Sequence, residues 1–546
     1  MPLNKRRDYY VAKSSVVLKS GPGSSKAENH LLLGDWLRWL GETSGDWEKV
    51  RCRGDVGWLK RDDFGTQRAL EVNFVDIGQG DDCHIVTPKD EVILIDAGVG
   101  SNMNRFLSWR YNLRSRNVKR AADFDAAENA LDPFLIDHVV ISHPDNDHYY
   151  GFLDVFNNQK LQFRNVYHNG IVERPDDPDP DPNLNYSDDL GGYTKGTRPA
   201  YVWDVVATSG RMKKISRTHP TTRKQYLSTI RALLKNSPAV RFDALSKRSE
   251  DLAATVHMGP FDDSASIALE VLGPLTERIT YHGTRRDVLR RLGSEGVTKN
   301  GHSVILKLQY GKLKVMLGGD LNTQSQDFLL QNYTSVRSKA SRLEKTLAQL
   351  QAKGTALSPA EQRTKDKTAA ALELIVSEAR AVFECDVTKA CHHGSSHFSD
   401  TFLQAVNATA TVISSGDEES HSHPRPDALG AFGKHGRGDR PLIFSTELAR
   451  STREFTPVIK FLDEIRQFEA DLASATDPAE QKKIRDRMES RRDRNVAVYG
   501  MITLRALGDQ VVLAQKLEVP RKESEKWDIY ELHYNAHTHA FEADGH

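Results

Sequence analysis

The segment that most constrains this chain is residues 137–148, where an apolar strand runs into a turn rich in metal-binding side chains. Residues 139–141 (Val-Val-Ile) are a β-branched run typical of a buried strand. Pro144 ends that strand, because proline cannot donate a ladder hydrogen bond. A turn placed after a buried strand can bring imidazoles and carboxylates together around cations. The sequence therefore predicts a metal site built on His143, Asp145, Asp147 and His148.

The spacing of these four residues resembles the H-x-H-x-D-H signature of the metallo-β-lactamase superfamily, with Asp145 in place of the second histidine. This variant is similar to the hydrolase domain of the DNA-uptake protein ComEC and its relatives. Other matching stretches are VDIGQGDD (75–82), ILIDAG (93–98), NGHSVIL (300–306), VMLGGDL (315–321) and KACHHGS (389–395). The resemblance covers about residues 70–440. It implies an α/β fold, an αββα sandwich with metals at one edge of two facing sheets.

The resemblance also implies roles for individual residues. Asp96 is expected to orient the metal-binding loop, and Asp320 to bridge two cations. One cation would be held by His143, Asp145 and His168, and the other by Asp147, His148 and one histidine of the pair His392 and His393.

The sequence leaves alternative roles open for four histidines. The sequence does not distinguish His392 from His393; we assign His393 to the metal and His392 to catalysis, beside Asp147. His168 is either a ligand or a turn histidine. His423 is expected near the active centre, as a substrate-binding or general-acid group, with a loop histidine as the alternative.

Two divalent cations about 3.5–4 Å apart can share a hydroxide and stabilise an in-line displacement. Zn²⁺ is the expected ion, with Mn²⁺ as an alternative because Asp145 adds a hard oxygen ligand. The expected function is a metal-dependent phosphodiesterase or nuclease acting on DNA or RNA. The first alternative is a hydrolase of a small phosphoester or lactone. The second is a docking protein with a vestigial metal site, which the intact ligand set disfavours.

A strongly basic segment supports a nucleic-acid substrate. Residues 205–248 contain eleven lysines and arginines and a single acidic residue, Asp243. Charge runs are usually solvated surfaces. A basic insertion beside a hydrolytic centre also suits a phosphodiester polymer, because neutralised phosphates release counterions.

Three units are expected along the chain. Residues 9–66 resemble a bacterial SH3-like β-barrel, which would serve as a docking module or a structural cap. Residues 70–450 would form the hydrolase domain, with the basic insertion 205–248 and a helical insertion 321–380. Residues 451–546 would add a helical hairpin and terminal strands that complete the sandwich.

Composition bears on the partners and the cellular compartment that we expect for this chain. The 546 residues contain 75 basic and 75 acidic residues, so net charge indicates no partner. No apolar run approaches the roughly 18 residues of a membrane span, and the N-terminus lacks the apolar stretch of a signal peptide. The four cysteines form no CxxC pair, which favours a reducing cytoplasm. A protein partner could bind through the SH3-like unit or the helical hairpin, as in a multi-component system such as anti-phage defence.

Overall fold

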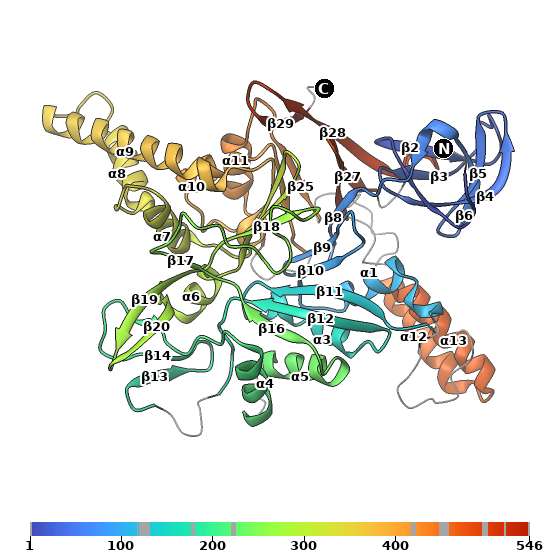
Figure 1. Cartoon of the computed structure of the whole chain (residues 1–546), viewed down its shortest axis with the longest axis horizontal. Helices are drawn as coiled ribbons and strands as arrows, with labels where there is room; N and C mark the ends of the chain where they lie inside the picture. The colour runs from blue at the N-terminus through green and yellow to red at the C-terminus, as the bar shows by residue number, and fades with distance from the viewer. Residues whose placement is uncertain are drawn as a thin grey trace.

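The computed structural model describes residues 3–116, 118, 131–175, 181–219, 225–416, 422–446, 458–493, 501–517 and 520–543. Four sheets organise these residues, and helices cover the two central sheets (Figure 1). In the described part of the chain, no helix combines the length and apolar character needed to cross a membrane. All four cysteines are free thiols.

The N-terminal unit is a seven-stranded antiparallel sheet with its own core. Its order is β3-β2-β6-β5-β4-β1-β7, with strands β1 (Asp8–Val11), β2 (Ser15–Lys19), β3 (Ala27–Leu32), β4 (Trp36–Ser44), β5 (Trp47–Cys52), β6 (Asp55–Lys60) and β7 (Phe64–Gly65). Strands β5 and β6 form a hairpin around Arg53, with Cys52 opposite Asp55. Tyr9 and Leu18 are among the buried residues of this core. Its likeness to an SH3 barrel stays a prediction.

A ten-stranded sheet forms the first half of the central body. Its order is β16-β12-β11-β10-β9-β8-β26-β27-β28-β29. The strands are β8 (Leu70–Phe74), β9 (Asp82–Val86), β10 (Val92–Ala97), β11 (Phe134–Ile141), β12 (Leu161–His168), β16 (Arg241–Ala244), β26 (Ile502–Leu507), β27 (Gln510–Lys516), β28 (Trp527–Asn535) and β29 (Ala540–Ala543). Strands β10, β11, β12 and β16 run parallel, so their carboxyl ends meet at one edge.

The second half is a six-stranded sheet of order β18-β21-β22-β23-β24-β25. Its strands are β18 (Ala268–Gly273), β21 (Ile305–Tyr310), β22 (Leu313–Leu317), β23 (Val387–Lys389), β24 (Ala410–Ile413) and β25 (Leu442–Ser445). Its last four strands, β22 to β25, run parallel.

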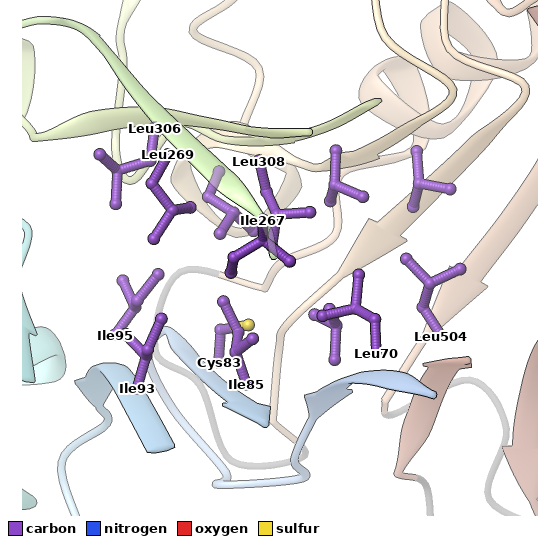
Figure 2. Close-up of a cluster of buried hydrophobic side chains, with 14 of the residues drawn as sticks. Leu70, Cys83, Ile85, Ile93, Ile95, Ile267, Leu269, Leu306, Leu308 and Leu504 are labelled. Atoms are coloured by element: carbon purple, nitrogen blue, oxygen red, sulfur yellow. The ribbon is translucent and has the colours of Figure 1, made fainter. Parts of the chain in front are cut away.

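The two large sheets face each other across one apolar core. Figure 2 shows Leu269 and Leu306 of one sheet opposite Ile93 and Ile95 of the other. Central strands such as β10 are almost continuously apolar because both faces of the sheet are covered.

Helices cover both outer faces. The outer face of the ten-stranded sheet buries α1 (Asn102–Arg110), α3 (Phe152–Asn157), α4 (Ser209–Thr218) and α5 (Tyr226–Asn236). The outer face of the six-stranded sheet buries α7 (Thr323–Tyr333), α8 (Ala340–Ala352), α9 (Pro359–Phe383) and α10 (Asp400–Val406). The resulting helix–sheet–sheet–helix layering agrees with the predicted sandwich.

The remaining elements lie around this body. A small sheet of order β13-β14-β15-β20-β19-β17 uses β13 (Leu184–Ser187), β14 (Gly191–Thr194), β15 (Tyr201–Val202), β17 (Lys247–Arg248), β19 (Leu275–Tyr281) and β20 (Thr284–Arg290). The other helices are α2 (Asn146–Tyr149), α6 (Glu295–Gly301), α11 (Pro426–His435), α12 (Val458–Ser474) and α13 (Pro478–Asp493). Helices α12 and α13 lie within the predicted helical hairpin (Figure 1).

Candidate metal centre

The candidate site lies where strands of both large sheets end. Strand β11 ends directly before the segment 142–148, and its parallel neighbour β10 carries Asp96 near its own end. From the facing sheet, β22 is followed by Asp320, and β23 is followed by the short 3₁₀ turn Cys391–Gly394. Polar side chains from both halves of the sandwich therefore meet at one edge.

Asp96 fixes the metal-binding loop. Its Oδ1 accepts a hydrogen bond from the Ser142 backbone N–H (2.7 Å), and its Oδ2 accepts one from the Ser142 hydroxyl (2.6 Å). The same Oδ2 lies 2.9 Å from Nδ1 of His148. An imidazole that donates through Nδ1 keeps its lone pair on Nε2, so this contact sets both the tautomer and the direction of His148. Asp96 thus has the orienting role that the sequence predicted.

Four side chains form a group with the spacing of metal ligands: Asp147, His148, Asp320 and His393. One ligand atom from each lies within 4.8 Å of all the others. Asp320 Oδ2 lies 3.3 Å from Nε2 of His148 and 3.4 Å from Nε2 of His393. Both Nε2 atoms and Asp320 Oδ1 are buried and make no hydrogen bond. Buried polar atoms without partners are costly, and a divalent cation at this point would satisfy them.

The Nδ1 atom of His393 has polar partners on the side away from Asp320, as Nδ1 of His148 does. Its Nδ1 donates to the Ser414 carbonyl (3.2 Å) and lies 3.0 Å from Oδ1 of Asp81. Asp81 also contacts the ammonium of Lys389. Gly80 permits this arrangement, because its φ is +109° and a Cβ there would lie 1.9 Å from the Asp147 carbonyl oxygen. Only glycine fits such an approach.

The electrostatics of the group favour a cation. Burial would raise the pKa of Asp320, but His393 and His148 hold it well below its ordinary value. Burial would lower the pKa of His393, but Asp320 and Asp147 raise it to about 10. The pKa of His148 is raised for a similar reason, against the effect of burial, by Asp320 and Asp96. Without metal, protons on the imidazoles balance the carboxylates; a bound cation would take that place.

The residues predicted for the first cation are not drawn together within 4.8 Å as the four-residue group is, although the Nε2 atoms of His143 and His168 are also buried without a hydrogen-bond partner. His143 is buried, with Nδ1 3.2 Å from the Ser303 hydroxyl and Nε2 3.7 Å from Oδ2 of Asp145. The other oxygen of Asp145 contacts the ammonium of Lys299. Burial would raise the pKa of Asp145, but His143 and Lys299 lower it to about 2.

His168 lies at the end of β12, as the sequence places it, but apart from the four-residue group. Its Nδ1 accepts a hydrogen bond from the Gly170 N–H (3.1 Å), which is the arrangement of a turn histidine. Burial lowers its pKa to about 4, so the ring is neutral. Among the described residues it makes no ion pair or ring contact with the other predicted ligands, and its role as a ligand stays a prediction.

His392 and His423 lie beside the metal group. The Nε2 of His392 is 3.8 Å from Oδ2 of Asp320, and its side chain is 22% exposed. The ring of His423 lies 5.8 Å from that of His392 and 6.2 Å from that of His393. His392 and His393 both have positive φ, 52° and 53°, a region that non-glycine residues rarely occupy. His393 lies within the group, and His392 beside it is partly exposed.

Two charged residues that the sequence interpretation missed or underrated adjoin the site. Lys299 lies in α6, directly before the NGHS motif, and carried no recognisable signal. Asp81 belongs to the VDIGQGDD stretch and was given only a weak link to the site. His302, by contrast, is a packing residue: its Nε2 contacts the Arg290 carbonyl oxygen (2.7 Å).

Residues 79–222 match the family model described as the metallo-beta-lactamase superfamily. This region holds Asp81, Asp96, Asp147 and His148, the half of the site supplied by the ten-stranded sheet. No curated protein matches the chain.

Proposed function

We propose that this chain is a metal-dependent hydrolase that cleaves phosphodiester bonds in DNA or RNA. The observation that carries the proposal is the group Asp147, His148, Asp320 and His393, with three buried ligand atoms that have no hydrogen-bond partner. The superfamily match over residues 79–222 supports hydrolysis as the reaction class. The identity of the substrate rests on charge and on the resemblance to ComEC-like hydrolases.

The donor set fits a divalent cation of the zinc class. Two imidazoles with two carboxylates suit Zn²⁺, and Mn²⁺ is the alternative because half of the donors are oxygens. When bound, the ion would activate water for attack and offset negative charge on the phosphoryl oxygens. Asp147 is 23% exposed, so the group can be reached from solvent.

His392 is the residue best placed to contact substrate. It lies next to Asp320 but keeps part of its side chain exposed, and its buried Nδ1 has no hydrogen-bond partner. His423 lies against it. We assign these two rings to binding the phosphate and to protonating the leaving group.

The basic segment contributes less charge to the surface than its composition suggests. Arg211 pairs with Asp204, Lys247 lies 3.8 Å from Glu270, and Arg248 pairs with Asp287. Four other members are exposed on α4, α5 and β16: Lys214, Arg217, Lys235 and Arg241. These four are the proposed contacts to the backbone of a nucleic acid.

We also propose that the N-terminal sheet is a docking module. The N-terminal sheet packs on the C-terminal strands through Leu32, Leu33 and Val512, and its separate core is consistent with an SH3-like docking module. A cytoplasmic location, a protein partner and a place in the ComEC-like branch fit this arrangement.

The test is a degradation assay on linear single-stranded DNA, double-stranded DNA and RNA, with Zn²⁺ or Mn²⁺ added. The wild type is compared with Asp147→Asn and His393→Gln, which preserve side-chain size. Cleavage by the wild type alone supports the proposal. Cleavage of an activated small phosphodiester, with every polymer left intact, would instead favour a small phosphoester as substrate.

A further inference from the structure

A buried lysine occupies the region that the sequence assigns to the first cation. Lys299 lies on α6, and its side chain is 6% exposed. Its ammonium contacts Oδ1 of Asp145, Oε1 of Glu173 (2.7 Å) and Oδ1 of Asp189 (2.8 Å). The three carboxylates come from three separate segments and converge on one nitrogen.

This ammonium is fully satisfied. A protonated lysine has three N–H donors, and each one meets a carboxylate oxygen here. Glu173 is itself 4% exposed, so the contact is a buried ion pair rather than a surface one. Burial would lower the pKa of Lys299, but Asp145 and Glu173 raise it, so the nitrogen stays charged. Breaking one such buried pair leaves an uncompensated charge, which is costly.

Both oxygens of Asp145 are already engaged. Oδ1 contacts Lys299, and Oδ2 lies 3.7 Å from Nε2 of His143. With the Asn300 amide oriented so that its nitrogen donates, Oδ2 also accepts a 2.7 Å hydrogen bond from Asn300. A cation bound to Oδ1 would have to displace the ammonium of Lys299.

We propose that Lys299 takes the place of the first cation, so that the chain binds a single divalent ion at Asp147, His148, Asp320 and His393. The inference rests on the proposed metal site. The fixed positive charge of Lys299 balances Asp145 and would repel a second divalent ion beside it. Asp145 stands where the signature that this segment resembles has a histidine. With Lys299 beside it, that position is half of an ion pair instead of a metal ligand.

The number of zinc ions bound per chain tests this proposal without an activity measurement. The protein is reconstituted with excess Zn²⁺, freed of loose metal by gel filtration, and measured by inductively coupled plasma mass spectrometry. We expect one zinc per chain in the wild type and in Asp145→Asn. Asp320→Asn should hold none. Two zincs in the wild type, with one lost in Asp145→Asn, would overturn the inference.

Variants of the lysine test the cause. Lys299→Met removes the ammonium that Asp145, Glu173 and Asp189 share, so a second zinc should now bind. Lys299→Arg keeps the positive charge and should hold one zinc. Lys307→Met is the matched control, because Lys307 pairs with Glu270 (3.1 Å) and lies outside the site. A Lys299→Met protein that folds yet still holds one zinc would contradict exclusion by the ammonium.

Electron paramagnetic resonance of the Mn²⁺-loaded wild type gives an independent reading that needs no variant to fold. A single isolated Mn²⁺ gives an uncoupled hyperfine spectrum, whereas two neighbouring ions show spin coupling. An uncoupled spectrum supports the inference, and a coupled one overturns it. A protein that holds one metal but cleaves no polymer would refute the proposed function and leave this inference standing.

Discussion

Asp96 Oδ2 lies 2.9 Å from Nδ1 of His148, and this contact points the opposite nitrogen of the ring at Asp320. A residue outside the four-residue group therefore sets the direction of a residue within it. Asp96 has a φ of +58°. Both the strained backbone and the two hydrogen bonds to Ser142 serve to hold that orientation.

We predict that Asp96→Asn weakens zinc binding by about 10–100-fold, the usual effect of removing a partner behind a metal ligand. The asparagine nitrogen cannot accept both donors, so His148 loses its fixed direction. Competition with a fluorescent chelator measures the change. Asp243→Asn, at an exposed position of β16, is the control and should bind zinc like the wild type. Unchanged affinity in Asp96→Asn would remove His148 from the ligand set.

Metal removal should lower stability. An ion that binds only the folded state adds about 2.7 kcal/mol when its free concentration is 100 times its Kd. The wild type should therefore melt at a lower temperature after chelation and recover when zinc is returned. Asp147→Asn and His393→Gln should show a much smaller response. Equal zinc-dependent shifts in all three proteins would place the metal elsewhere.

The buried carboxylate of Glu71 should stabilise the fold at neutral pH. It pairs with Arg110 (2.8 Å) and Arg505 (3.2 Å). Burial would raise the pKa of Glu71, but these two cations hold it well below the ordinary value. Glu71→Gln removes the carboxylate that Arg110 and Arg505 share and leaves Arg505 with the longer contact to Asp35 (3.7 Å). We expect a loss of about 3 kcal/mol in the free energy of unfolding at pH 7.

The sign of its pH dependence follows from the lowered pKa. The folded state binds this proton more weakly than the unfolded state, so the stabilisation is present above about pH 4.3 and is lost as pH falls further. Urea titrations of wild type and Glu71→Gln at a series of pH values should show their difference shrinking in acid. A constant difference would mean that packing, not charge, is responsible.

The exposed basic residues of α4, α5 and β16 should set the salt dependence of nucleic-acid binding. Removing one cation that neutralises a phosphate should reduce the slope of log K against log salt by about 0.9 for duplex DNA. We expect a shallower slope when Lys214, Arg217, Lys235 and Arg241 are changed to glutamine. The control set is Lys345, Arg363, Lys365 and Lys367 on α8 and α9, which should leave the slope unchanged. Identical slopes for all three proteins would exclude α4 and α5 as the binding face.

Much of the fold could be predicted because its signals are local. The Val-Val-Ile run of 139–141 lies in β11 of the structure, and Gly-rich or Pro-containing turns end the strands that carry the site. Asp96, Asp147, His148, Asp320 and His393 all belong to short motifs at strand ends. Parallel strands bring such ends to one edge, so a pattern along the chain becomes a group in space.

The basic segment was interpreted too simply. The segment was expected to be a basic insertion, either a solvated surface or a contact to nucleic acid, but Met212 and Ile215 of α4, with Ile230 and Leu233 of α5, pack on the outer face of the ten-stranded sheet. These helices are part of the outer layer. Several lysines and arginines of this segment form ion pairs with acidic residues of the fold, and only the tertiary structure shows these pairs.

Other features were missed because they depend on distant partners. Lys299 and Glu173 are 126 residues apart, and nothing local marks either as half of a buried pair. The acidic, proline-containing composition of residues 173–190 is typical of a solvated loop. Residues 176–180 lie outside the described chain, but Glu173 is buried and residues 184–187 form β13. The terminal strands expected in residues 451–546 correspond to β26 and β27, whereas β28 and β29 could not be placed from sequence because their mixed polar residues lack a clear alternation.

The most direct test of the central claim is metal-dependent cleavage of a nucleic acid by the purified chain. Wild type, Asp147→Asn and His393→Gln are incubated with labelled DNA and RNA, with zinc or manganese and after chelation. We predict cleavage by the wild type only, abolished by chelation and restored by metal. Cleavage that survives chelation, or that persists in both variants, would contradict a catalytic centre built on Asp147, His148, Asp320 and His393.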